Sequence, residues 1–270
     1  MRNKTVACVI ARTVSTRLPL KVLRTVCGHY TMLDFILQRL KQVKNIDAIY
    51  ICTSHERVDD ILEDIAQNNG VQIYRGSPDA VIERLISVGD IEEADNVIRI
   101  TGDNIFTSCE YLEKQIEIHN SNNLDYTRII DVPIGATAEV MRLSALKECY
   151  DLIDPSISEY LLLYMYKPEH YKCGVLNISG LKDCSNYTLT VDTEEDLNRT
   201  RKIFDYYDLP DVLNIKLLDI LDIVDEYNIP FSNIQPSGMV KMPYGKEISY
   251  SDFSDDMKNR KNNSQKFILE

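Results

Sequence analysis

Residues 6–21, Val-Ala-Cys-Val-Ile-Ala-Arg-Thr-Val-Ser-Thr-Arg-Leu-Pro-Leu-Lys, are the stretch of sequence that decides the fold. The first five residues form a short apolar run, which predicts a buried β-strand. The remainder is polar and carries cations at Arg12, Arg17 and Lys21. A buried strand that ends in a polar loop is typical of open α/β sheets, where ligands bind beyond the carboxyl ends of the strands.

Further short apolar runs at residues 48–52, 71–74 and 97–101 predict three more strands. Between the strands, apolar residues recur at helical spacing over residues 32–40, 61–65 and 81–85. Thr31 is a candidate N-cap for the first of these helices, and Gly70 ends the second. Strands that alternate with helices imply right-handed βαβ crossovers. The sequence therefore predicts a three-layer α/β fold with a mainly parallel mixed sheet.

The second half of the chain continues this pattern less regularly. Residues 126–130, 175–178 and 189–191 read as strands, and residues 110–120, 142–151, 195–206 and 214–227 read as helices. After Pro230 the periodicity weakens, and the chain ends in a polar, charged segment. We predict one main domain over residues 1–230 and a C-terminal extension over residues 231–270 with a mobile terminus.

Composition narrows the class of protein. The 270 residues carry 30 basic and 42 acidic side chains, a net charge of −12, which argues against a nucleic-acid partner and against an anionic membrane surface. No apolar run approaches the roughly 18 residues of a membrane span, and the N-terminus lacks the cleavage site of a secretory signal. The seven scattered cysteines and four isolated histidines form no metal-binding motif. A cytoplasmic protein is expected.

The loop over residues 11–21 has the chemistry of a polyphosphate site. Arg12 and Arg17 offer forked hydrogen bonds, Lys21 offers a point charge, and successive backbone amides can form an anion-binding nest. The loop contains no glycine and matches no common phosphate-binding motif. The alternative interpretation is a solvated loop that carries ordinary surface cations.

Two acidic residues follow other predicted strands. Asp103 ends the run Arg-Ile-Thr-Gly-Asp at residues 99–103, and Asp192 follows Thr190-Val191. Two carboxylates at two strand ends can share one Mg²⁺, which prefers oxygen ligands and accompanies phosphates. The alternative for Asp192 is helix capping, because an acid before a helix with another acid soon after it is also a capping pattern.

Together these segments resemble the cytidylyltransferases that activate acidic sugars. The loop ARTVSTRLPLKVL is similar to that of the spore-coat polysaccharide protein F group, which is related to the 3-deoxy-manno-octulosonate and acylneuraminate cytidylyltransferases. The resemblance continues through YRGSPDAVIERL (residues 74–85), RITGDN (99–104), Glu139-Val140 and TVDTEEDL (190–197). It implies a Rossmann-like nucleotide-diphospho-sugar transferase fold, a homodimer, CTP or another NTP as one substrate, a small sugar-type acceptor as the other, and Mg²⁺ as cofactor.

The resemblance also implies roles for individual residues. Arg12, Arg17, Lys21 and Asp103 match catalytic positions, and Asp103 and Asp192 match the two metal-binding aspartates. The acceptor is expected near Glu139, Glu159 and Tyr160. The matching nucleotide-binding positions are Ala11, Arg12, Ser15, Thr16, Arg17, Lys21, Gly76, Ser77, Thr101 and Gly102.

The sequence departs from the family loop at two positions. Val14 and Leu20 stand where the spore-coat group has glycine. A β-branched residue resists a positive φ, so the backbone at Val14 must bend differently from that of the family or lose a phosphate contact. Two other functions stay open. A glycosyltransferase of related fold is disfavoured because Asn104 and Ile105 follow Asp103, so no acid-x-acid pair is present. A non-catalytic nucleotide-binding module is the third candidate.

Overall fold

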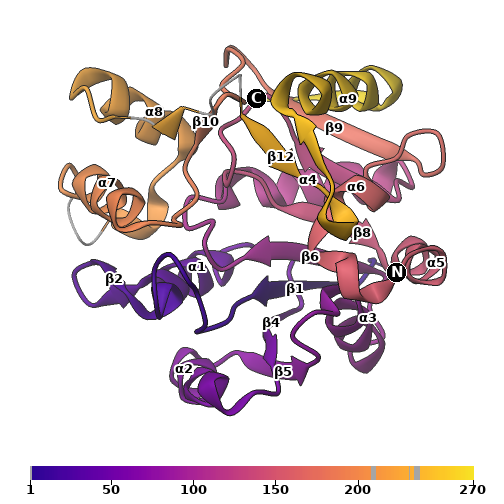
Figure 1. The fold of residues 1–270 in the computed structure, drawn as a ribbon, viewed down its shortest axis with the longest axis horizontal. Helices are drawn as coiled ribbons and strands as arrows, with labels where there is room; N and C mark the ends of the chain where they lie inside the picture. Colours follow the sequence, from indigo (N-terminus) through magenta and orange to yellow (C-terminus); the bar gives the residue numbers. More distant parts are fainter. Residues whose placement is uncertain (1, 208–210, 231, 234–237) are drawn as a thin grey trace.

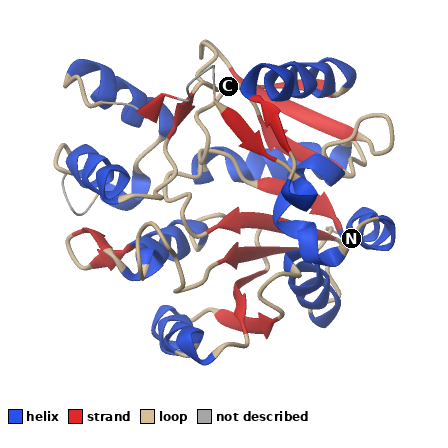
Figure 2. Ribbon diagram, in the orientation of Figure 1, coloured by secondary structure: helices blue, strands red, loops and turns tan. Residues whose placement is uncertain are grey.

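The described residues of the computed structural model, 2–207, 211–230, 232–233 and 238–270, form a central sheet of eight strands in the order β14-β9-β7-β8-β6-β1-β4-β5. Figure 1 shows this sheet with helices on both sides, and Figure 2 separates helices from strands by colour. The strands are β1 (Thr5–Ile10), β4 (Ala48–Ser54), β5 (Gln72–Gly76), β6 (Asn96–Thr101), β7 (Tyr126–Ile129), β8 (Glu139–Arg142), β9 (Cys173–Ile178) and β14 (Gln265–Leu269).

Strand β1 shows why the molecule has three layers. Successive side chains of a strand point to opposite faces. Val6 and Cys8 pack under one set of helices, whereas Ala7 and Val9 pack under the other, and all four are fully buried. The first face is covered by α3 (Val81–Ile91), α5 (Leu143–Leu152) and α6 (Leu161–Met165), and the second by α1 (Met32–Leu40), α2 (Ile61–Asn69) and α4 (Cys109–Ser121). The predicted three-layer α/β fold is confirmed.

Strand β8 is the antiparallel member of this otherwise parallel sheet. It pairs with β6 and with β7 in antiparallel register, while the other neighbouring strands of the sheet run parallel. In this register Glu139 lies opposite Arg99 on one side and opposite Arg128 on the other. The sequence pattern did not predict this strand, although the sheet is the mainly parallel, mixed sheet that was expected.

A third core lies beside the sheet, where α7 (Glu194–Phe204) and α8 (Leu217–Glu226) pack on the ends of β7 and β9. The strand predicted at residues 189–191 is wrong. The ladder is formed earlier, by β10 (Tyr187–Thr188) with β11 (Ser232–Asn233), and the following residues run as a loop. That loop is nevertheless tied down, because the amide of Val191 donates to the carbonyl of Asp103 at 3.0 Å.

The C-terminal residues are part of the fold. Helix α9 (Tyr250–Asn263) leads into β14, which pairs in parallel with β9 at one edge of the central sheet. Lys261 contacts both carboxylate oxygens of Asp131 at 2.7 Å, and Arg260 donates to the carbonyls of Leu163 and Tyr166. Residues 250–269 thus add a helix and an edge strand to the fold, and the mobility of the terminus stays a prediction.

Three small elements complete the chain. The hairpin of β2 (Thr25–Cys27) and β3 (Tyr30–Thr31) precedes α1, and β12 (Met239–Lys241) pairs with β13 (Glu247–Ser249) before α9. Short 3₁₀ turns occur at η1 (Lys21–Leu23), η2 (Arg57–Asp59), η3 (Pro155–Tyr160), η4 (Val212–Asn214) and η5 (Pro243–Gly245). Among the described residues, none of the helices combines the length and the apolar character that a membrane span requires.

Candidate active site

Three segments that are far apart in sequence meet at the carboxyl ends of β1 and β6. They are the loop after β1, the turn after β6 and the residues just before α7. Together they border a cavity of about 630 Å³. Ten of the residues predicted to bind nucleotide or metal line it: Ala11, Arg12, Ser15, Thr16, Arg17, Lys21, Thr101, Gly102, Asp103 and Asp192.

The centre of the cavity is a compact set of charges, which we call the cavity cluster: Arg17, Lys21, Asp103 and Asp192. The Lys21 ammonium lies 2.8 Å from Asp103 Oδ2 and 2.9 Å from Asp192 Oδ1. Arg17 also reaches Asp192 Oδ1, at 3.0 Å. Burial by itself lowers the pKa of Lys21, but Asp103 and Asp192 outweigh it and the pKa is raised, so the ammonium stays charged.

The side chain of Asp192 does not cap the helix that follows. Thr193 is the N-cap of α7, and it forms a reciprocal capping box with Asp196. The Asp192 carboxylate instead points to the cations of the cavity cluster. Of the two interpretations left open by the sequence, the capping contact is made by Thr193 and Asp196 instead of the Asp192 side chain, and metal binding by Asp192 stays a prediction.

The backbone of the loop accommodates the two residues that replace glycine in different ways. Val14 has no positive φ and is 58% exposed. Leu20 has φ 55° and ψ 29°, the left-handed conformation, immediately before Lys21. The strained position is therefore Leu20, whereas the backbone at Val14 bends in a way that a β-branched residue tolerates.

Asp59 is a residue of this region that the sequence did not reveal. It is fully buried in η2, where its Oδ1 accepts hydrogen bonds from the amide of Thr13 at 2.8 Å and from the Thr13 hydroxyl at 2.7 Å. Its Oδ2 accepts a hydrogen bond from Ser54. An acid just before a helix reads as a surface cap, so no local pattern distinguishes Asp59 from its neighbour Asp60.

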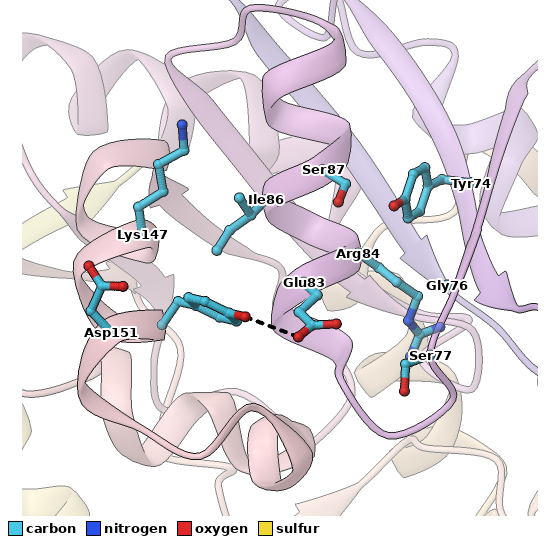
Figure 3. A pocket seen from close by; sticks show the side chains of 10 residues that line it. Tyr74, Gly76, Ser77, Glu83, Arg84, Ile86, Ser87, Lys147 and Asp151 are labelled. Atoms are coloured by element: carbon cyan, nitrogen blue, oxygen red, sulfur yellow. Dashed lines mark hydrogen bonds between the residues drawn. The ribbon is translucent and has the colours of Figure 1, made fainter.

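Gly76 and Ser77 border a second cavity of about 570 Å³, between α3 and α5 (Figure 3). Its wall includes Tyr74 and Glu83, and the hydroxyl of Tyr150 donates to Glu83 Oε1 at 3.1 Å. Arg84 lines both cavities and is almost fully buried, donating to the carbonyls of Cys52 and Pro78.

Gly76 leaves the space that Arg84 occupies. A Cβ atom at residue 76 would lie 2.8 Å from Arg84 Cγ, so a larger residue would displace this arginine. Burial lowers the pKa of Arg84, and the positive charge of Arg12 lowers it further. Gly76 and Ser77 are thus adjacent to the main cavity and connected to it through Arg84.

Glu139 belongs to a second group of charges, the β8 cluster: Arg99, Tyr126, Arg128 and Glu139. Its carboxylate pairs with Arg99 and accepts a hydrogen bond from Tyr126 at 2.6 Å. Burial raises the pKa of Glu139, but the charges of Arg99 and Arg128 and the Tyr126 hydrogen bond outweigh burial and lower it. The Glu139 side chain is 8% exposed and does not line the main cavity. The residue of this cluster that lines the cavity is Arg99.

The other predicted acceptor residues lie on η3, next to the main cavity. Tyr160 ends this turn and is half-buried, and Ser156 of the same turn lines the cavity. The turn is held against α3, because the hydroxyl of Ser158 accepts a hydrogen bond from the amide of Ile82 at 3.0 Å. The side chain of Glu159 lies outside the described part of the structure.

Comparison with known sequences gives one family. The sequence profile of the family described as Cytidylyltransferase matches residues 6–167. The spore coat polysaccharide biosynthesis protein SpsF of Bacillus subtilis is 32% identical over 228 residues, which span 82% of this chain and 95% of that protein. The family profile includes the loop at residues 11–21 and the strands β1 and β6 that position it.

Comparison with solved structures agrees. A cytidylyltransferase from Leptospira borgpetersenii superposes with a TM-score of 0.77 at 26% identity, covering 86% of this chain and 99% of that one. A CMP-2-keto-3-deoxy-manno-octonic acid synthetase, solved with CTP, gives a TM-score of 0.59 at 18% identity over 75% of this chain and 98% of that one, which shows a shared fold. The nucleotidyltransferase fold implied by the sequence resemblance is confirmed.

Proposed function

This chain belongs to the cytidylyltransferase family and is a nucleotidyltransferase, and from that premise we propose that it transfers CMP from CTP to a small sugar-type acceptor. The products are the CMP-activated acceptor and pyrophosphate. In this reaction an oxygen of the acceptor attacks the α-phosphorus of CTP, and the bond from that phosphorus to the β-phosphate oxygen breaks.

The observation that carries the proposal is the cavity cluster. Lys21 and Arg17 bind carboxylate oxygens at 2.8–3.0 Å. A triphosphate offers the same cations more negative charge and more acceptor oxygens. Lys21 and both arginines of the loop, Arg12 and Arg17, can therefore hold the phosphates and stabilise pyrophosphate as it leaves.

The lining of the cavity favours anions although the whole chain is acidic. Five cationic side chains, from Arg12, Arg17, Lys21, Arg84 and Arg99, face three carboxylates, from Asp79, Asp103 and Asp192. The protein as a whole has a net charge of −12. The local excess of positive charge suits a nucleoside triphosphate, and positioning within this field accounts for most of the catalysis that we propose.

Asp103 and Asp192 would hold Mg²⁺. Their carboxylates converge on one ammonium, which supports a cation between them. The described residues contain no group of three or more histidine, cysteine or acidic side chains that could bind a metal by themselves. Two carboxylates suffice for Mg²⁺, which takes its remaining ligands from water and substrate phosphates. Bound there, the ion would neutralise charge on the α-phosphate and on the attacking oxygen.

For the acceptor, we propose a sugar, sugar acid or sugar phosphate used in surface glycan biosynthesis. It would approach from the side of Arg99 and Ser156, which line the cavity beyond the loop. A homodimer, as implied by the family resemblance, is part of the same proposal.

The experiment is an assay of pyrophosphate release with Mg²⁺, in which each of the four NTPs is tested against a panel of acidic sugars and sugar phosphates. We expect release with CTP and one class of acceptor. Release with another NTP would keep the reaction and correct the base. Transfer from a nucleotide sugar without pyrophosphate release would favour a glycosyltransferase, and CTP binding without turnover over the whole panel would favour a non-catalytic module.

A further inference from the structure

Asp59 is placed where it can support the loop at residues 11–21. It lies in η2, between β4 and α2, with no exposed surface, so it cannot touch a ligand in the cavity. Three of its hydrogen bonds come from two residues, the amide and hydroxyl of Thr13 and the hydroxyl of Ser54. Burial raises the pKa of Asp59, but these hydrogen bonds outweigh burial and lower it, so the carboxylate is charged at neutral pH.

Thr13 is where the two ends of the loop meet. Its amide and hydroxyl bind Asp59 Oδ1, at 2.8 and 2.7 Å, and its carbonyl accepts a hydrogen bond from the amide of Leu20 at 3.2 Å. Residues 13–20 are thereby closed into one turn. The next residue is Lys21, whose ammonium lies between the carboxylates of the cavity cluster.

Most residues of this turn are exposed, and Arg17 is held by its ion pair with Asp192. Val14, Thr16 and Arg17 are exposed, and Leu18 is the side chain of the turn that enters the core. Leu20 is held in the left-handed conformation, which an L-residue leaves unless its surroundings enforce it. Hydrogen bonds to a charged acceptor are about twice as strong as neutral ones, and Asp59 supplies such an acceptor at the base of the turn.

We propose that Asp59 is a positioning residue for nucleotide binding, which acts through Thr13 to fix the conformation of the loop and the position of Lys21. This inference rests on the proposed function. It predicts that the charge of Asp59 and the hydroxyl of Thr13 matter for affinity toward the triphosphate, although neither group reaches the cavity.

The test compares four variants: Asp59→Asn, Thr13→Val, Thr13→Ser and Ser54→Ala. Affinity for α,β-methylene-CTP with Mg²⁺ is measured by titration calorimetry, and stability is measured by urea unfolding. Asp59→Asn and Thr13→Val should each weaken binding on the order of tenfold, because each removes a charge-assisted contact to the loop. Thr13→Ser keeps the hydroxyl and should bind as the wild type does.

Ser54→Ala is the matched control. It removes the hydrogen bond to the other oxygen of Asp59 and leaves the contact with Thr13 in place. It should lower stability while affinity stays unchanged. A role confined to folding would instead lower the stability of all four variants and leave the affinity of every folded protein equal to that of the wild type, which overturns the inference.

The design also separates this inference from the proposed function. Wild-type protein that binds the analogue, together with Asp59→Asn and Thr13→Val that bind it equally well, refutes the positioning role alone. Wild-type protein that binds no nucleotide analogue refutes the proposed function, and the positioning role with it. Should Asp59→Asn fail to fold, the comparison of Thr13→Val with Thr13→Ser decides.

Discussion

The cavity cluster and the β8 cluster contain the same kinds of charged group in different surroundings. In the cavity cluster, Arg17 is 64% exposed and both aspartates are partly exposed, and Lys21 between them is 15% exposed. All four side chains line the cavity, so a ligand can compete for their contacts. In the β8 cluster, Glu139 is 8% and Arg99 16% exposed, and both lie on paired strands. Accessible charges held by exchangeable partners favour binding, whereas buried charges held in a sheet favour a fixed structure.

The largest expected effect concerns the β8 cluster. Glu139 is buried, and Glu139→Gln keeps the shape of the side chain but leaves the half-buried Arg99 and Arg128 without their carboxylate. Loss of one partner of a buried ion pair costs about 3–5 kcal/mol of unfolding free energy. Urea unfolding at neutral pH measures this loss.

The same change at an exposed ion pair is the control. Glu194 pairs with Arg24 at 2.9 Å, and its side chain is 53% exposed. Glu194→Gln should cost less than about 1 kcal/mol. Equal losses of unfolding free energy in the two variants would mean that Glu139 contributes no more to stability than a carboxylate in a surface ion pair.

Because the pKa of Glu139 is depressed in the folded protein, its contribution to stability also depends on pH. The contribution is complete above the unfolded pKa of about 4.3 and is lost as pH falls through the lower folded pKa. The stability difference between wild type and Glu139→Gln should therefore shrink on acidification. A difference that grows toward low pH would contradict the assigned direction of the pKa shift.

The two clusters also differ in how well the sequence predicts them. Lys21 and Asp103 follow predicted strands that do form, so the rule that ligands bind at the carboxyl ends of strands places them together. Asp192 follows a predicted strand that does not form, and its segment is held instead by the hydrogen bond from the amide of Val191 to the carbonyl of Asp103. Strand β8 has four residues, two of them charged, which gives it neither an apolar run nor a clear alternation. Its antiparallel insertion is decided by pairing with β7, which precedes it in the chain, and with β6, which is distant in sequence.

Other features that the sequence did not predict have the same physical origin. Strand β14 lies at the sheet edge and buries a single residue, Leu269, so its sequence shows no strand pattern. Asp59 is distinguished by contacts with Thr13, which is 46 residues away in the chain. The left-handed φ at Leu20 is set by the closing of the loop on Thr13, which no propensity of leucine indicates.

The second prediction concerns activity and the cavity cluster. Asp103→Asn should lower turnover on the order of 10²–10³-fold, the scale of losing one transition-state contact. Pyrophosphate release with CTP and the acceptor found in the panel measures it. Asp79→Asn changes a carboxylate that borders the same cavity outside the contacts of Lys21, and it should have a smaller effect. Near-normal turnover of Asp103→Asn would remove this residue from the catalytic set.

The ion pairs of Lys21 with Asp103 and Asp192 can be tested by metal binding. In the free protein a metal ion must compete with the ammonium of Lys21 for both carboxylates. Lys21→Met should therefore tighten binding of Mn²⁺ to the nucleotide-free protein on the order of tenfold, because ion pairs worth roughly 1 kcal/mol each no longer oppose it. Turnover should fall in the same variant, because the phosphates lose a cation.

Electron paramagnetic resonance of Mn²⁺ measures this affinity without any turnover. Arg12→Met is the control, because the Arg12 guanidinium donates to the carbonyl of Pro78 at 3.3 Å and its loss frees no carboxylate of the cavity cluster. Weaker Mn²⁺ binding by Lys21→Met than by the wild type would show that Lys21 orders the site for the metal instead of competing with it.

The smallest expected effect is on the free energy of unfolding, and it comes from the backbone conformation, which differs between the two regions. The β8 cluster lies on regular strands, whereas the loop holds Leu20 at φ 55°. A left-handed L-residue costs roughly 1–2 kcal/mol, and glycine costs about 0.5–1 kcal/mol in lost backbone freedom. Leu20 is 52% exposed, so its side chain contributes little burial. Leu20→Gly should therefore raise the free energy of unfolding by up to about 1 kcal/mol.

Val14→Gly is the matched change at a position without positive φ. There glycine brings only its entropic cost, so stability should fall by about 0.5–1 kcal/mol. Urea unfolding of both variants gives the sign of each effect. Opposite signs would establish that the loop stores its strain at Leu20, next to the lysine that closes the cavity cluster. A lower free energy of unfolding in both variants would mean that contacts of the Leu20 side chain offset the cost of its left-handed conformation. Leucine in place of glycine at residue 20 would then carry no penalty in stability.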